Sequence, residues 1–164
     1  MAATPRGVQL KLKEHSYRES LLVWREDKRA AIPRRRGSEC IGYDLCTVDE
    51  CTLIPGVMSF VSTGLVMRVP DGHYGRLASH PESLELGIDV LNGVVEPDSR
   101  AVVRVAIINR TASAITIPTS TVVALLVLER ASAVAVFEAV GGIDQLSIRQ
   151  GNTPRLGKDD FLLA

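Results

Sequence analysis

The chain has 164 residues, which is the size of one ordinary domain. Its 19 Lys and Arg residues are balanced by 19 Asp and Glu residues, so net charge gives no general argument for binding to DNA or RNA. With 46% apolar and 23% charged residues, the chain is expected to fold around a core rather than to be intrinsically disordered.

Targeting and metal signals are weak in this sequence. Every apolar run is shorter than the ~18 residues that a membrane span needs, and charged residues such as Arg6 and Lys11 interrupt the first segment. We therefore expect an intracellular protein with neither a signal peptide nor a transmembrane helix. Cys40, Cys46 and Cys51 form no C-x-x-C pair, so we expect reduced, buried thiols rather than a zinc site.

Short strands are predicted along most of the chain. Alternating apolar and polar residues predict the first strand, and β-branched apolar segments bounded by Gly, Pro or Asp predict the others. These strands span residues 8–13, 60–69, 74–78, 86–91, 101–109, 114–117 and 122–128. One short helix is expected near residues 79–86. Strands that recur every eight to twelve residues favour an all-β barrel or sandwich.

Turn and loop signals complete the pattern. Pro70-Asp71-Gly72 predicts a turn, and Asn92-Gly93 between apolar residues predicts a β-hairpin. The first forty residues are polar and end in the run Arg34–Arg36. The usual interpretation of such a run is a solvated loop, and an anion-facing loop is the alternative. Residues 150–160 have little to bury and are expected to form a mobile arm.

Four stretches in chain order carry a resemblance to a known family. They read G-Y-D-L (42–45), T-G-L followed by P-D-G-H-Y-G-R-L-A (63–78), I-D-V-L-N-G-V-V-E-P-D-S-R (88–100) and L-V-L-E-R (126–130). Their order and spacing resemble the motifs of the trimeric dUTPases, and the chain looks like a divergent, viral-type member. G-N-T-P-R-L-G (151–157) is a fainter echo of the family's glycine-rich phosphate arm.

The resemblance implies a fold, an assembly and a reaction. The fold is a jelly-roll-like β-barrel over residues 1–148 followed by a C-terminal arm over residues 149–164. Three copies form a homotrimer whose active sites use residues of all three subunits. The reaction is hydrolysis of dUTP to dUMP and pyrophosphate, with Mg²⁺ bound to the triphosphate.

The third stretch supplies the candidate catalytic residues. Glu96 stands where the family has its water-activating Asp, and Asp98 is either a substitute base or only the residue of a Pro-Asp turn. The hairpin around Asn92, Gly93 and Val94 is expected to read uracil through backbone groups. Ser99 stands where the family has an aromatic ring, so discrimination against a 2′-hydroxyl is expected to be weaker.

The other stretches supply candidate substrate-binding residues. By resemblance, Asp44 and Arg76 lie near the nucleotide, and Asp44 is a possible outer-shell ligand of Mg²⁺. His80 and Ser83 stand near the positions of the family's P-R-S-G arginine and serine. Arg155 is the arginine that remains of the glycine-rich arm.

The phosphate-binding motifs depart from the family pattern. Glu82 adds a negative charge beside the P-R-S-G position, and Leu125 replaces the fourth motif's glutamine. If independent, three lost phosphate partners cost about 5–9 kcal/mol of binding. Two functions therefore stay open: a dUTP hydrolase, or an inactive dUTPase-like module that binds a protein partner, for example through Phe161–Ala164. Membership of the related dCTP-processing branch is a third alternative.

Overall fold

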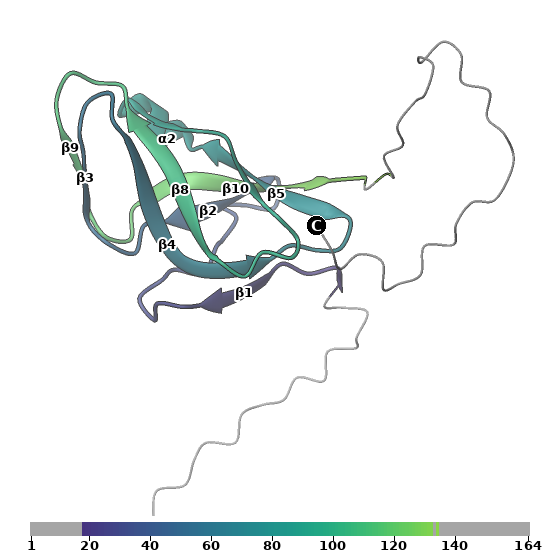
Figure 1. Cartoon of the computed structure of the whole chain (residues 1–164). Helices are drawn as coiled ribbons and strands as arrows, with labels where there is room; N and C mark the ends of the chain where they lie inside the picture. Colours follow the sequence, from purple (N-terminus) through teal and green to yellow (C-terminus); the bar gives the residue numbers. More distant parts are fainter. Residues whose placement is uncertain (1–17, 133, 135–164) are drawn as a thin grey trace, which may run out of the picture. The chain divides into compact units, whose positions relative to one another are not determined.

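The computed structural model describes residues 18–132 and residue 134. This part of the chain forms ten strands and one short helix, and Figure 1 labels most of them. The strands are β1 (Leu22–Arg25), β2 (Gly42–Cys46), β3 (Cys51–Leu53), β4 (Met58–Arg68), β5 (His73–Ser79), β6 (Ile88–Val90), β7 (Gly93–Val95), β8 (Val102–Asn109), β9 (Ile115–Ile117) and β10 (Val122–Arg130). The helix, α2 (Pro81–Glu85), connects β5 to β6.

Two four-stranded antiparallel sheets share one core. Their strand orders are β1-β4-β8-β6 and β2-β10-β5-β7, and β3 and β9 form a separate two-stranded sheet. The core contains Leu65 and Ile107 from the first sheet and Leu45 and Leu126 from the second, all fully buried. The predicted all-β fold is confirmed, as two sheets facing one core rather than a closed hydrogen-bonded barrel.

The longer predicted elements agree with the structure. The predictions over residues 60–69, 74–78, 101–109, 114–117 and 122–128 correspond to β4, β5, β8, β9 and β10, and the predicted helix is α2. The predicted turn at Pro70 is closed by a 3.1 Å hydrogen bond from the His73 amide to the Pro70 carbonyl. The predicted strand over residues 8–13, Arg155 and the predicted arm over residues 149–164 lie outside the described residues.

The hairpin predicted at Asn92-Gly93 is wrong. Although β6 and β7 are separated by two residues, β6 pairs with β8 and β7 pairs with β5 in the other sheet. Gly93 lies opposite Leu77 of β5, and an added Cβ would come within 2.9 Å of the Leu77 side chain. The chain thus passes from one sheet to the other here, and in this arrangement Ile88, Val90 and Val95 are all buried in the common core.

The Thr63-Gly64-Leu65 segment has a structural role in the middle of β4. The Thr63 hydroxyl is buried and donates a 2.8 Å hydrogen bond to the Val103 carbonyl of β8. The β4–β8 register shifts between Ser62 and Val66, and Gly64 has φ +66° inside this irregularity. Glycine adopts that backbone conformation without strain. The segment therefore bends β4 without leaving the buried Thr63 hydroxyl unpaired.

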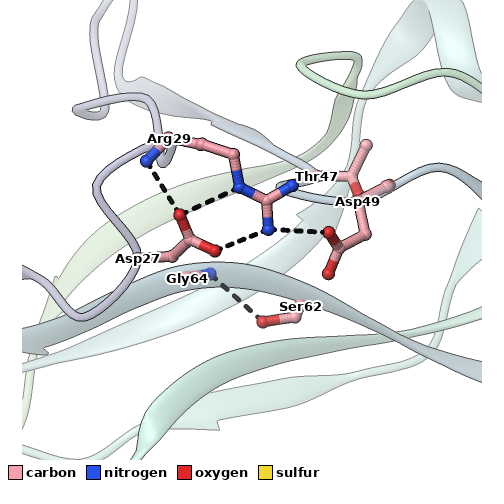
Figure 2. A network of polar contacts seen from close by, with 6 residues as sticks. All are labelled: Asp27, Arg29, Thr47, Asp49, Ser62 and Gly64. Atoms are coloured by element: carbon pink, nitrogen blue, oxygen red, sulfur yellow. Dashed lines mark hydrogen bonds and ion pairs between the residues drawn. The ribbon is translucent and has the colours of Figure 1, made fainter.

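The bend in β4 also holds the loop that follows β1. The Gly64 carbonyl accepts hydrogen bonds from the amides of Glu26 and Asp27, at 3.0 and 3.1 Å. Figure 2 shows Arg29 of this loop between two carboxylates, with its Nη2 2.7 Å from Asp27 Oδ2 and 2.9 Å from Asp49 Oδ1. The loop after β1 is thus joined both to β4 and to the turn after β2.

The cysteines are less buried than predicted. All three have free thiols, but Cys40 is exposed and Cys46 and Cys51 are half-buried. Burial raises the pKa of the Cys46 and Cys51 thiols. Of the helices that the structure describes, none is long and apolar enough to cross a membrane.

Gly75 provides a test of how closely the side chains of β7 and β10 pack over β5. A Cβ at this position would lie 2.6 Å from Leu126 Cδ1 and 3.1 Å from Val95 Cβ. We expect Gly75→Ala to lower the free energy of unfolding by about 1–3 kcal/mol, because overpacking a dense core forces neighbours to move. Urea denaturation measures this change. The exposed substitution Ser38→Ala should stay within about 0.5 kcal/mol of the parent, and an equally small effect of Gly75→Ala would contradict the packing.

Candidate functional site

Three positions from separate motifs meet at one cavity. Asp44 of β2, His80 at the start of α2 and Leu125 of β10 all line a cavity of about 340 Å³. Sheet register explains the meeting, because Leu125 lies opposite Asp44 on one side and opposite Ala78 of β5 on the other. We call Asp44, Arg36, His80 and Glu82 the Asp44 corner.

Arg36 joins the two carboxylates of the Asp44 corner. Its Nε donates a 3.0 Å hydrogen bond to Asp44 Oδ2, and its Nη1 donates a 2.8 Å hydrogen bond to Glu82 Oε1. The hydrogen bond from Arg36 lowers the pKa of the Glu82 carboxyl below its ordinary value of 4.5, and Glu82 and Asp44 together raise the pKa of Arg36. The corner therefore contains one guanidinium held between two carboxylates.

His80 is buried and caps α2. Its Nδ1 accepts a 3.2 Å hydrogen bond from the Glu82 amide, which places the ring proton on Nε2. Nε2 lies 3.9 Å from Asp44 Oδ1. That oxygen is buried and has no hydrogen-bond partner among the described residues. Buried polar atoms are usually paired, so an unpaired carboxylate oxygen beside a cavity is a feature that a ligand could satisfy.

Ser83 and Leu125 contribute differently to this region. The Ser83 side chain is buried, and its hydroxyl donates to the Val122 carbonyl at 3.4 Å, so it ties α2 to β10. Leu125 is half-buried and presents an apolar side chain to the cavity. Neither Ser83 nor Leu125 therefore offers an unpaired polar group to the cavity.

The candidate catalytic residues lie on the loop between β7 and β8. We call residues 96–101 the Glu96 loop. The Ser99 amide donates a 3.2 Å hydrogen bond to the Glu96 carbonyl, and Arg100 Nη1 donates to the Asp98 carbonyl at 2.8 Å. Glu96 and Asp98 are both exposed. The loop backbone is thus fixed by its own hydrogen bonds while both carboxylates face solvent.

A second, smaller cavity lies beside the Glu96 loop. It has a volume of about 250 Å³, and Val94, Ser99, Phe60 and Arg104 are among its lining residues. Val94 is exposed, as is Asn92, whereas Gly93 is half-buried. The sequence analysis missed Phe60 and Arg104, whose guanidinium lies 5.6 Å from the centre of the Phe60 ring. An aromatic ring is therefore present near Ser99, although on a different strand from the one the family pattern indicates.

The Asp44 corner and the Glu96 loop lie far apart in one chain. Glu96 directly follows Val95, the last residue of β7, which lies opposite Gly75 of β5, whereas Asp44 is level with Ala78, three strands across the sheet. Spacings of ~3.3 Å per residue and ~4.8 Å per strand separate them by about 20 Å. A single carboxylate side chain cannot bridge that distance, so one chain does not bring the two groups together.

Arg76 belongs to a third cluster, on the outward face of β5 and β10. Its Nε donates a 2.7 Å hydrogen bond to Glu129 Oε1, and the Tyr74 hydroxyl donates to the other oxygen of the same carboxylate. These two contacts lower the pKa of Glu129, with the Tyr74 hydrogen bond as the larger cause, and raise the pKa of Tyr74. Arg76 is therefore engaged within its own sheet rather than at the Asp44 corner.

This cluster makes a prediction about titration. We expect Tyr74→Phe to raise the pKa of Glu129 toward 4.5 while leaving it below that value, because Arg76 still contacts the carboxylate. In the parent, Glu129 stabilises the fold above pH 4.5, and this contribution is lost as the pH falls through the lowered pKa. Carboxyl ¹³C NMR measures the shift. Tyr43→Phe is the matched control, and an unchanged Glu129 pKa in Tyr74→Phe would contradict the assignment.

The fold is similar to those of solved phage dUTPases. The dUTPase of Staphylococcus bacteriophage 80alpha, as a variant with dUpNHpp, has a TM-score of 0.70 and 17% identity, covering 82% of this chain and 95% of the phage protein. A variant of the dUTPase from phage phi11 of S. aureus, described with a structural Mg(II) ion, has a TM-score of 0.68 and 16% identity, covering 73% and 96% of the two chains. At such identities the likeness establishes the fold alone.

Sequence comparison establishes the family. The dUTPase family model matches residues 28–156. A deoxyuridine 5′-triphosphate nucleotidohydrolase of Paramecium bursaria Chlorella virus 1 is 35% identical over 112 residues, which are 68% of this chain and 79% of the viral protein. The chain belongs to the dUTPase family.

Proposed function

We propose that this protein hydrolyses dUTP to dUMP and pyrophosphate. Glu96 accepts a proton from the attacking water, and the water oxygen bonds to the α-phosphorus. The bond from the α-phosphorus to the oxygen that bridges the α- and β-phosphates breaks, and pyrophosphate leaves. Glu96 is exposed, so water can reach its carboxylate. Family membership supports the reaction. We propose that the uracil ring binds in the cavity beside Val94 and Ser99.

The separation of about 20 Å between the Asp44 corner and the Glu96 loop carries the proposal. A nucleotide held at the corner of one copy can meet Glu96 only if a second copy supplies it. We therefore propose that the chain assembles as a homotrimer with shared active sites. In each active site, one chain then supplies the Asp44 corner and a neighbouring chain supplies the Glu96 loop.

The partly exposed apolar residues on the outward face of β8 support the proposed homotrimer. Along β8, Val103, Val105 and Ile107 are buried, whereas Ala106 and Ile108 on the opposite face are half-buried. The aliphatic sequence of this strand predicted burial on both faces, so a cover from outside this chain accounts for the second face. Among the described residues, Phe60 and Val94 are also exposed beside the Glu96 loop.

The Asp44 corner fits a magnesium-bound triphosphate. Mg²⁺ prefers oxygen ligands and keeps several of its waters, and the unpaired Asp44 Oδ1 is an oxygen that can accept a hydrogen bond from such a water. Bound Mg²⁺ neutralises negative charge on the phosphates. We propose Asp44 as an outer-shell ligand of the Mg²⁺ that is bound to the triphosphate.

Two measurements on the purified protein test the proposal. With dUTP and Mg²⁺ we expect pyrophosphate release, and light scattering should give three times the chain mass of 17.8 kDa. A monomer at micromolar concentration would contradict the shared site. No release above buffer at high protein concentration would contradict the hydrolase.

One observation favours a second candidate, an inactive dUTPase-like module. Leu125 faces the cavity in place of a polar group, and the Ser83 hydroxyl is occupied by the Val122 carbonyl. A chain with those changes can bind a deoxyuridine nucleotide without hydrolysing it. Binding of dUpNHpp by a protein that releases no pyrophosphate from dUTP would favour this module over the hydrolase.

A further inference from the structure

We propose that Arg36 is the phosphate-binding arginine of this chain, and that it binds the terminal phosphates of the nucleotide. The inference rests on the proposed function, because it names the group that holds the anionic end of dUTP. Arg36 lies in the loop before β2, outside the four stretches that resemble the family motifs. Neither the family pattern nor the sequence spacing therefore points to it.

Charge at the cavity singles out Arg36. The described residues that line the 340 Å³ cavity include two acids, Glu39 and Asp44, and the neutral imidazole of His80. Among them, Arg36 alone carries a permanent positive charge. Arg36 offsets only one of these two carboxylates, so a phosphate needs both this guanidinium and a Mg²⁺ that neutralises its own charge in order to bind here.

The guanidinium has donors left for a ligand. An arginine carries five N–H groups, and Arg36 uses Nε on Asp44 and one Nη1 proton on Glu82. Three N–H groups remain, and about 44% of the side-chain surface is exposed. A planar guanidinium with free N–H groups is suited to paired hydrogen bonds with phosphate oxygens.

The two carboxylate contacts have different roles. Asp44 is mostly buried and fixes Nε, so it orients the guanidinium at the cavity. Glu82 is 66% exposed, and an exposed ion pair contributes little stability. A phosphate can therefore replace Glu82 on Nη1 at small cost. In the absence of nucleotide, Glu82 occupies the position that the phosphate takes in the complex.

Calorimetric titration of the full-length protein tests the proposal with two probes, both with Mg²⁺. Inorganic pyrophosphate reports on the Asp44 corner, and dUMP reports on nucleoside recognition. We expect Arg36→Met to weaken pyrophosphate binding by about 10- to 100-fold, since it removes hydrogen bonds from a charged donor, and to change dUMP binding less than twofold. Arg25→Met, on exposed β1, removes the same net charge and should leave both affinities unchanged.

Glu82→Gln is expected to strengthen pyrophosphate binding, whereas Arg36→Met weakens it. The glutamine variant removes a negative charge at the corner and leaves only a neutral, weaker acceptor to compete for Nη1, so pyrophosphate should bind several-fold more tightly than to the parent. Unfolding curves that match the parent for Arg36→Met show that the fold is intact.

Each remaining outcome separates the two proposals. Parent-like pyrophosphate binding by Arg36→Met would overturn the assignment of Arg36 and leave the proposed function standing, provided that dUMP binds. Binding of dUMP but not pyrophosphate to the parent would also overturn the assignment alone. A parent that binds neither dUMP nor pyrophosphate would overturn the proposed function, and the assignment with it.

Discussion

Glu96→Gln is expected to lower the rate of dUTP hydrolysis by about 10²- to 10⁴-fold, the usual contribution of a general base. Glutamine has nearly the same shape as glutamate but cannot accept the proton from water. Since Glu96 is exposed, the substitution should leave the fold unchanged. Pyrophosphate release under saturating dUTP and Mg²⁺ measures the effect.

Asp98→Asn is the matched control, two residues along the same loop. Asp98 is also exposed, and its carbonyl rather than its carboxylate accepts the hydrogen bond from Arg100. We expect Asp98→Asn to change the rate less than tenfold. If Asp98→Asn removes activity while Glu96→Gln retains it, the base is Asp98 and the assignment of Glu96 is wrong.

The largest effect on stability is expected at Asn109, at the end of β8. This side chain is fully buried, and its Nδ2 donates to the carbonyls of Leu53 and Ser113, at 3.0 and 2.7 Å. Its Oδ1 accepts from the Thr111 amide at 2.9 Å. Asn109→Ala removes these three hydrogen bonds from a buried site, and the Ser113 carbonyl keeps a second donor, the Thr111 hydroxyl. We expect a loss of about 3–5 kcal/mol in the free energy of unfolding.

Urea denaturation of Asn109→Ala measures this loss. The control is Asn92→Ala, an exposed asparagine that should change the free energy of unfolding by less than about 0.5 kcal/mol. A loss below 1 kcal/mol for Asn109→Ala would show that the buried hydrogen bonds at this end of β8 are not as described.

Local sequence patterns predicted the long strands, the short β9 and the helix, and missed the short strands β1, β2 and β3. Strands such as β8 and β10 are continuous β-branched and aliphatic segments, and α2 begins with Pro81 after a capping residue. By contrast, β1, β2 and β3 have only three to five residues each, and they exist because β4, β10 and β9 offer them partners. Pairing with a distant strand is not encoded in a short segment.

The same reason explains the hairpin at Asn92-Gly93. That dipeptide favours a tight turn locally, but residues 75–77 of β5 and 107–109 of β8 compete for the two flanking segments. The distant partners win because both flanking strands then bury their apolar residues in the common core. A turn signal describes a local preference, and burial decides between the alternatives.

Part of the candidate site could be predicted from the sequence, and part of it could not. The resemblance indicated Asp44, His80 and the position of Leu125, and the structure brings these three to one cavity. Arg36 was part of an arginine run with two open interpretations, because a charge run does not name its partner. Its contact with Glu82 joins residues 46 positions apart in sequence, and only the fold shows it.

Titration of the protein with the non-hydrolysable analogue dUpNHpp in the presence of Mg²⁺ tests the central claim most directly. A dUTPase-family chain that has kept its nucleotide site should bind this analogue saturably, and more tightly than the corresponding deoxycytidine and thymidine analogues. Binding that fails to saturate at millimolar analogue, or that is equal for all three bases, would contradict a deoxyuridine nucleotide site.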